Sequence, residues 1–179
     1  MDVPSQGTVA VGDKITASLW NDDVRDAVNF LTDPPRCKLR KSVTQVIPTA
    51  TNTAITWDTE VYDTDTMHDN ATNNTRITFT TAGTYLITLN AMWGASATGT
   101  RRIVIEKNGT TYGTGTAVIT PFATPGVNFA YNGATVSVEA QFSAGEYILV
   151  WGYQDSTANL NFAGTAEGYS NISARWVAT

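Results

Sequence analysis

The chain of 179 residues has almost no cysteine and no long apolar run. Its single cysteine, Cys37, excludes an internal disulfide and any metal site built from several cysteines. No segment approaches the ~20 consecutive apolar residues of a membrane-spanning helix. No basic run followed by an apolar stretch marks a secretion signal near the N-terminus. We therefore expect a soluble protein, made in a cytoplasm, with no membrane as partner.

Charge is also scarce, because Asp, Glu, Lys and Arg make up only 15% of the residues. The 16 acidic against 11 basic residues give a formal net charge of −5, which provides no general attraction to phosphate backbones. We therefore expect no nucleic acid as partner. The length allows one domain with a sizeable core. We expect residues 1–36 to form an N-terminal arm and helix, and residues 37–179 to form one domain.

What the sequence does contain is one strand pattern in two copies. Residues 77–93 and 136–153 both show alternating apolar positions around a hinge, Ala82-Gly83 in the first and Ala144-Gly145 in the second. Side chains alternate between the two faces of a strand, so every second residue lies on the same face. The residues that this pattern and the C-terminal strand assign to the core or to a subunit interface are Tyr85, Leu89, Trp93, Tyr147, Leu149, Trp151 and Trp176.

From Cys37 onward the chain consists of short alternating segments between turn residues, which is typical of an antiparallel sandwich or barrel. The dipeptide Asn108-Gly109 predicts a tight hairpin. Loops are predicted over 61–75, 121–133 and 155–168, which lack periodicity. The predicted strands cover residues 37–45, 54–60, 76–80, 84–93, 101–107, 110–120, 135–142, 146–154 and 171–177.

One helix is predicted, over residues 16–31. Its N-cap is Thr16, and Asp33-Pro34-Pro35 ends it because proline cannot continue a helix. One face carries the apolar residues Trp20, Val24, Val28 and Leu31. A single helix ahead of a β domain has to bury that face, either on its own domain or on a neighbouring molecule. The sequence leaves both alternatives open.

The only cluster with residues suited to catalysis or metal binding surrounds His68. No G-x-S-x-G turn or comparable nucleophile motif accompanies it, so we assign no catalytic residue and expect no enzyme. Asp63 and Asp65 could offer oxygen ligands to a divalent cation, but the glycine and distal glutamate of a calcium-binding loop are missing. In the alternative, these carboxylates shape turns. We assign no cofactor or metal ligand and keep the cation as an alternative.

The strand motifs resemble those of the C1q/TNF-like jelly roll. The residues that carry the resemblance are Ile77, Phe79, Ala82-Gly83, Tyr85, Asn108-Gly109, Gln141 and Ala144-Gly145-Glu146-Tyr147-Ile148. The resemblance covers residues 37–179 and implies an all-β antiparallel jelly-roll sandwich that assembles as a homotrimer. The chain departs from the family at Glu146, where aspartate is common, and in its C-terminal strand, which lacks the Phe-Ser-Gly-Phe pattern.

The N-terminal pattern GDKITASLWNDDVRDAVNFLTDPPRC, together with WDTEVYDTDTMHD, is similar to small proteins of tailed phages of actinobacteria. In those proteins a short helix precedes a C1q-like domain. The resemblance implies a structural protein on the virion surface. Trp20, Val24, Val28 and Leu31 would then anchor it to the major capsid protein or another virion protein.

Three functions remain open. The first is a trimeric capsid decoration or head-fibre protein, favoured because no collagen-like repeat or heptad run separates the helix from the domain. The second is a small tail-fibre or tail-tip protein whose loops bind a host cell-surface glycan. The third is a separate carbohydrate-binding or enzymatic domain.

Overall fold

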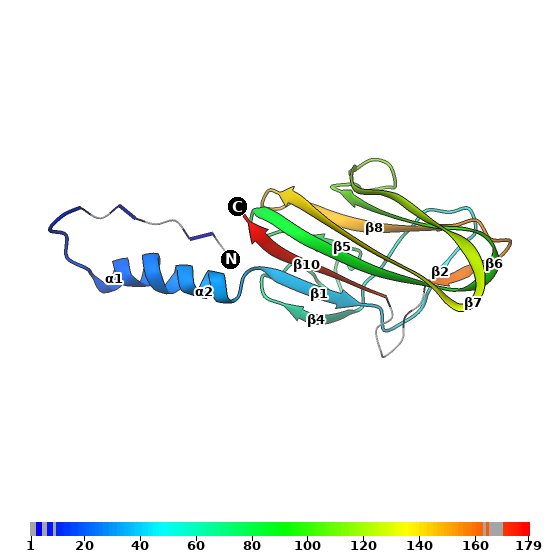
Figure 1. Ribbon diagram of the computed structural model, residues 1–179, viewed down its shortest axis with the longest axis horizontal. Helices are drawn as coiled ribbons and strands as arrows, with labels where there is room; N and C mark the ends of the chain where they lie inside the picture. The colour runs from blue at the N-terminus through cyan, green and yellow to red at the C-terminus, as the bar shows by residue number, and fades with distance from the viewer. Residues whose placement is uncertain (1–2, 5–6, 9, 163, 165–169) are drawn as a thin grey trace.

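The computed structural model describes residues 3–4, 7–8, 10–162, 164 and 170–179, and it shows a β-sandwich preceded by a helix (Figure 1). The helix consists of α1 (Ala17–Trp20), the π-helical segment η1 (Asn21–Arg25) and α2 (Asp26–Thr32). The strands are β1 (Arg36–Arg40), β2 (Gln45–Ile47), β3 (Thr53–Ala54), β4 (Thr59–Asp63), β5 (Arg76–Thr78), β6 (Gly83–Lys107), β7 (Thr116–Phe142), β8 (Tyr147–Gln154), β9 (Leu160–Phe162) and β10 (Asn171–Ala178).

The strands pair antiparallel in two layers that share β6 and β7. In one layer, the β10 sheet, the order is β4, β1, β10, the first half of β6 and the second half of β7. In the other, the β8 sheet, the first half of β7 pairs with the second half of β6, which pairs with β8, and β8 pairs with β3 and β5. The predicted antiparallel sandwich is confirmed.

Strands β6 and β7 are longer than predicted because each passes from one sheet into the other. The predicted segments 84–93 and 101–107 are the two halves of β6, joined through a bend where its register with β7 shifts. The buried Arg101 guanidinium holds this bend, since it donates hydrogen bonds to the carbonyl oxygens of Ser96 (2.8 Å) and Thr98 (2.6 Å). A turn fixed by a buried guanidinium thus stands where the sequence suggested a break.

The predicted loop at 121–133 is wrong, because these residues belong to β7. Their pairing with β6 stabilises the strand although their own periodicity is weak. The predicted strand start at Thr110 is also wrong, since β7 begins at Thr116. A wider turn over residues 108–115 replaces the tight hairpin, and the Glu106 carboxylate accepts a hydrogen bond from the Gly113 amide (3.0 Å).

Three further boundaries differ from the prediction. The segment 37–45 divides into β1 and β2, because the Asp58 carboxylate accepts hydrogen bonds from the amides of Ser42 (2.6 Å) and Val43 (3.1 Å) and turns the chain. The segment 54–60 divides into β3 and β4, and β4 continues into the predicted loop 61–75. Strand β9 lies within the predicted loop 155–168, of which 163 and 165–169 fall outside the described residues.

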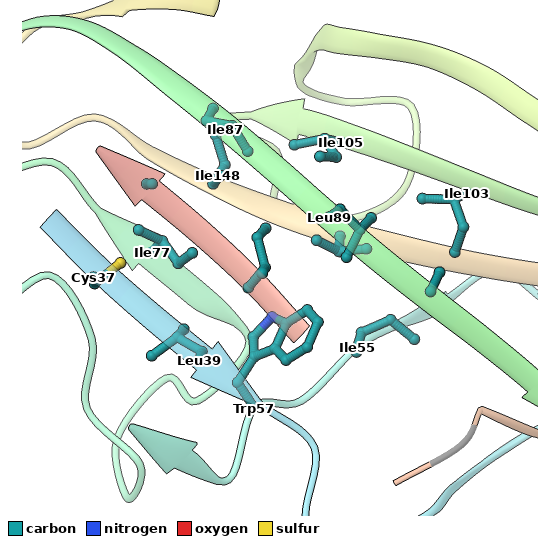
Figure 2. Close-up of a cluster of buried hydrophobic side chains, with 14 of the residues drawn as sticks. Cys37, Leu39, Ile55, Trp57, Ile77, Ile87, Leu89, Ile103, Ile105 and Ile148 are labelled. Atoms are coloured by element: carbon teal, nitrogen blue, oxygen red, sulfur yellow. The ribbon is translucent and has the colours of Figure 1, made fainter. Parts of the chain in front are cut away.

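The core lies between the two sheets, where side chains from β1, β5, β6 and β8 converge around Trp57 (Figure 2). Tyr85, Leu89 and Trp93 are each at most 1% exposed, so the predicted face of β6 is the core face. Aromatic rings pack closely at both ends of the core, with Phe79 stacked on Phe142 at 3.8 Å and Trp93 edge-on to Phe162 at 5.2 Å.

The matching face of β8 points the other way. Ile148 and Val150 enter the core, whereas Leu149 and Trp151 form a smaller cluster with Val104 on the outer side of the β8 sheet. Tyr112, in the turn 108–115, covers this cluster and lies edge-on to Trp151 at 6.1 Å between ring centroids. Leu149 and Trp151 are therefore buried within the chain, and Tyr147 packs beside them.

Both hinge glycines adopt left-handed backbone conformations, with φ of +147° at Gly83 and +88° at Gly145. At Gly83 a Cβ atom would lie 2.1 Å from Trp176 Nε1, whereas at Gly145 it would meet nothing within 4 Å. The first hinge is thus closed by β10, and the second is open. In the described part of the chain, no helix is long and apolar enough to cross a membrane.

Candidate functional site

A stripe of exposed apolar residues runs along the helix, formed by Trp20, Val24, Val28 and Leu31, which we call the helix stripe. Their side chains are 56%, 38%, 51% and 73% exposed. Thr16 caps the helix as predicted, because its Oγ1 accepts a hydrogen bond from the Leu19 amide (3.2 Å). Trp20, Val24 and Val28 are spaced four residues apart, slightly more than the about 3.6 residues of one α-helical turn. Such a row drifts around an α-helix, and the wider turn of η1 reduces this drift. The stripe therefore runs along one side.

The helix is attached to the sandwich at one end only. Phe30 is 4% exposed, and its ring lies edge-on to Trp176 of β10 at 4.8 Å. Below this contact, Arg36 pairs with Asp33 (Nη2 to Oδ1, 2.9 Å). Figure 1 shows the helix projecting from the end of the sandwich where β1 begins and β10 ends. Of the two alternatives for the helix face, its own domain covers Phe30 and leaves the helix stripe uncovered.

The described residues of the N-terminal arm run back along the helix. The Gly7 amide donates to Asp23 Oδ1 (2.8 Å), and a Cβ at Gly7 would also contact Leu19. A shallow cavity of about 240 Å³ lies between the arm and the end of the helix, lined by Val3, Pro4, Ala27, Phe30, Leu31 and Trp176. The described part of the arm therefore supports the helix and comes near the helix stripe at Leu31, which stays 73% exposed.

The solvent side of the β10 sheet is the second candidate surface, because Tyr85, Leu89 and Trp93 point into the core and cannot form an interface. Several small uncharged side chains on this side bond to one another across strands. Thr88 and Ser137 are joined at 2.9 Å, and Asn90 accepts from Thr135 (2.6 Å) and donates to Asn171 (3.1 Å). We call this surface the polar face.

Trp176 has a structural role at the junction. Its Nε1 donates to the Ala82 carbonyl oxygen (3.2 Å), and its ring packs on Phe30. Of the predicted core or interface residues, Trp176 therefore connects the helix, β10 and the first hinge.

Around His68, the carboxylates of Asp63 and Asp65 accept hydrogen bonds that stabilise turns. Asp63 accepts hydrogen bonds from the amides of Asp65 (3.1 Å) and His68 (2.9 Å), and Asp65 Oδ2 accepts from the Thr81 hydroxyl (2.7 Å). His68 Nδ1 lies 2.7 Å from the Arg76 carbonyl oxygen and so carries the proton of that bond. Among the described residues, no three His, Cys, Asp or Glu side chains gather as they would around a metal ion.

The outer side of the β8 sheet carries stacked arginine and tyrosine side chains that the sequence did not reveal. The Arg102 guanidinium lies 4.3 Å from the ring centroid of Tyr153 and 5.5 Å from that of Tyr112, and it donates to Asn52 Oδ1 (2.9 Å). The buried Trp151 Nε1 has no hydrogen-bond partner among the described residues. We call Arg102, Tyr112, Tyr153, Asn52 and Trp151 the Arg–Tyr surface. Only the β6–β8 register, which sets Arg102 opposite Tyr153, brings them together.

A polar clamp around Glu146 lies next to the second hinge. Glu146 accepts hydrogen bonds from the Ser143 amide (2.8 Å), Lys107 Nζ (3.1 Å) and Asn108 Nδ2 (3.0 Å). The bond from the Ser143 amide is the largest cause that lowers the pKa of the Glu146 carboxyl below its usual 4.5, and Lys107 and Asn108 add to it. In contrast, burial raises the pKa of the Cys37 thiol well above its usual value, so this cysteine is unreactive.

No family model matches the chain, and no curated protein matches it. Solved structures do. The globular domain of zebrafish complement 1qA protein matches with a TM-score of 0.57 and 8% identity, covering 80% of this chain and 97% of that chain. A crystal structure of murine APRIL at pH 8.0 matches with a TM-score of 0.59 and 15% identity, covering 80% of this chain and 98% of that chain. The structure of Eiger TNF from S. frugiperda matches with a TM-score of 0.57 and 10% identity, covering 80% of this chain and 92% of that chain.

Identities this low indicate a shared fold and nothing about a shared activity. The chain therefore has the antiparallel jelly-roll fold of C1q and TNF-like domains, as the strand motifs predicted.

Proposed function

We propose that the chain is a non-enzymatic structural protein of a tailed-phage virion, a homotrimeric capsid decoration or head-fibre protein attached through its N-terminal segment. It would stabilise the capsid or mediate adhesion from the virion surface. The observation that supports this most directly is the helix stripe, which stands exposed on a helix that projects from the jelly roll. An apolar stripe of this kind marks an interaction site. The N-terminal resemblance to actinobacteriophage proteins supports the phage context.

The helix stripe suits an anchor in size as well as position. Fully burying a Val or Leu side chain stabilises a contact by about 1.5–3 kcal/mol, and Trp buries more area than either. Four such residues, each between 38% and 73% exposed, would yield on the order of 5 kcal/mol per copy when covered. A trimer would present three stripes to the capsid, and this multivalency strengthens attachment beyond that of one helix.

Trp20→Ala tests the anchor, because it removes the largest apolar group of the stripe. We expect the variant to occupy virions at a level reduced at least about tenfold, measured by quantitative mass spectrometry of purified particles. The jelly roll should keep its near-UV circular dichroism. A matched control is Val46→Ala in β2, because Val46 is 52% exposed but lies on the sandwich. Equal occupancy of the two variants would contradict the anchor.

A small tail-fibre or tail-tip protein that binds a host cell-surface glycan is the second candidate. The observation that favours it is the Arg–Tyr surface, where two tyrosine rings lie beside the Arg102 guanidinium, which donates to Asn52 Oδ1. Aromatic faces combined with a few polar groups are common in small-molecule sites. Copy number distinguishes the two candidates. Hundreds of copies per virion would exclude the tail position, and a handful would exclude decoration.

A further inference from the structure

A cavity of about 240 Å³ lies between strand β5 and the loop 64–75 that precedes it. The loop returns beside β5, because the Thr78 amide donates to the Met67 carbonyl oxygen (2.7 Å) and His68 Nδ1 donates to that of Arg76 (2.7 Å). The cavity is smaller than the about 300–1,000 Å³ of sites for drug-sized ligands, so it suits one small unit. Its lining includes His68, Asp69, Thr72, Asn73, Arg76 and Thr78.

His68 offers this cavity a buried acceptor that lacks a donor. The residue is 9% exposed, and its Nδ1 carries the proton of the bond to the Arg76 carbonyl, so Nε2 of the neutral ring is an acceptor. No described residue donates a hydrogen bond to Nε2. A buried polar atom without a partner costs free energy. A ligand that brings a donor group into the cavity would remove this cost.

Arg76 supplies donors on the same lining. Its guanidinium lies 4.2 Å from the ring centroid of Tyr147, and this stacking holds the side chain in place. The described residues place no carboxylate within ion-pair distance of it. A guanidinium that is already held loses little side-chain entropy when it binds, and its N–H groups donate to oxygen atoms.

Asp69 adds a second acceptor, and the loop around it is fixed before any ligand binds. Its Oδ1 accepts hydrogen bonds from the amides of Ala71 (2.8 Å) and Thr72 (3.1 Å). The Ala71 amide is the largest cause that lowers the pKa of Asp69 below its usual 3.8, so the carboxylate is ionised at neutral pH. Thr66 and Asn73 have left-handed backbones, with φ of +51° and +54°. Such a loop keeps its shape only because these contacts hold it.

We propose that this cavity binds one unit of an uncharged saccharide, whose hydroxyl groups donate to His68 Nε2 and Asp69 and accept from Arg76. A hydroxyl group both donates and accepts, so one sugar ring satisfies all three side chains. An anionic ligand would meet Asp69 and a cationic ligand would meet Arg76, and like charges brought together are costly. The inference rests on the adhesion in the proposed function and gives it a class of ligand.

The test uses the one histidine of the chain as a reporter. The full chain is titrated with glucose, galactose, mannose and N-acetylglucosamine, and the His68 imidazole nitrogens are followed by NMR. At least one sugar should shift the Nε2 resonance, with a dissociation constant in the millimolar range because a single ring has few atoms. The uronic acid and the amino sugar of the same ring should bind at least about tenfold more weakly, since each brings one like charge.

Conservative variants separate binding from folding. His68→Asn keeps a side-chain N–H for the Arg76 carbonyl and removes the acceptor, so affinity should fall at least about fivefold, read from the amide resonances of residues 64–78. Arg76→Lys should weaken binding similarly because it removes the planar fork. Arg102→Lys is the matched control, since Arg102 also stacks on a tyrosine but lies outside the cavity. Asp69→Asn keeps Oδ1 for the turn and should improve binding of the uronic acid.

The outcomes are distinct. No shift with any of the four sugars would overturn the inference and assign Nε2 to a water molecule. Tighter binding of the uronic acid than of the neutral sugar by the wild type would overturn the uncharged class. Binding lost in Arg102→Lys and kept in Arg76→Lys would contradict the cavity and favour the Arg–Tyr surface. Copy number and the Trp20→Ala occupancy measure the virion role separately, so either proposal can fail alone.

Discussion

The helix and β6 carry equally apolar faces, but their environments are opposite. Tyr85, Leu89 and Trp93 on β6 are at most 1% exposed, whereas Trp20 and Val28 on the helix are 56% and 51% exposed. A strand in a sandwich faces a second sheet across the core. The helix faces no such layer, and Phe30 is the residue that α2 buries against the sandwich. The jelly roll therefore derives its stability from within the chain, and the helix depends on what it contacts.

A substitution at the junction of β6 and β10 should reduce the free energy of unfolding more than any other, because the jelly roll is stabilised from within the chain. Gly83→Ala should destabilise the protein by about 3 kcal/mol or more, because Gly83 has φ +147° and the new Cβ would collide with Trp176 and with the Ala178 carbonyl. Urea unfolding of the variant and the wild type measures this loss of free energy.

Gly145→Ala is the matched control for this first prediction. It should cost only about 1–2 kcal/mol, since its backbone is left-handed but the space around it is open. Equal losses at the two hinges would show that backbone strain alone, and no contact with Trp176, limits the first hinge.

The next effect should appear where the helix meets the sandwich. Phe30→Ala removes the buried ring that packs edge-on to Trp176, so about 2–3 kcal/mol of helix docking should be lost. Hydrogen exchange should accelerate over residues 17–32 with little change in the sheets. Leu31→Ala is the control, because Leu31 is 73% exposed and should leave exchange unchanged. If both variants exchange alike, the Phe30 contact does not hold the helix.

A smaller change in stability should follow from protonating Glu146 at low pH. The Ser143 amide, together with Lys107 and Asn108, lowers the pKa of Glu146 in the folded state below its usual 4.5. The carboxylate therefore stabilises the fold fully above about pH 4.5, and this contribution disappears as the pH falls through the lowered pKa. Glu146→Gln should be less stable than the wild type at pH 7, and the gap should narrow below pH 4 in urea titrations. A gap that is constant with pH would exclude an ionised clamp.

The smallest effect should come from the helix stripe in isolated protein. Val28 and Val61 are 51% and 52% exposed, one on the helix and one on β4. Val28→Ser and Val61→Ser should each change the free energy of unfolding by no more than about 0.5 kcal/mol. Thermal unfolding checks this at several protein concentrations. A loss of several degrees for Val28→Ser alone would mean that the stripe is already covered in solution.

Much of the fold could be predicted from local patterns. The alternation of residues 85–93 identified the core face of β6, and Thr16 and Pro34 set the ends of the helix. The extent of β7 could not be predicted, because residues 121–133 are strand only through pairing with β6. The Arg–Tyr surface was missed for the same reason, since Arg102 and Tyr153 are far apart in sequence and meet only through the register of β6 with β8.

The sequence by itself determined which side chains are apolar, where the strands alternate, where the helix is capped and how few charges the chain carries. Only the tertiary structure decided which apolar faces are covered. Trp151 and Trp20 lie in similar apolar patterns, but the turn around Tyr112 covers the first and nothing in the described chain covers the second. Burial depends on what packs across from a residue, and that partner is set by long-range pairing, which local periodicity does not encode.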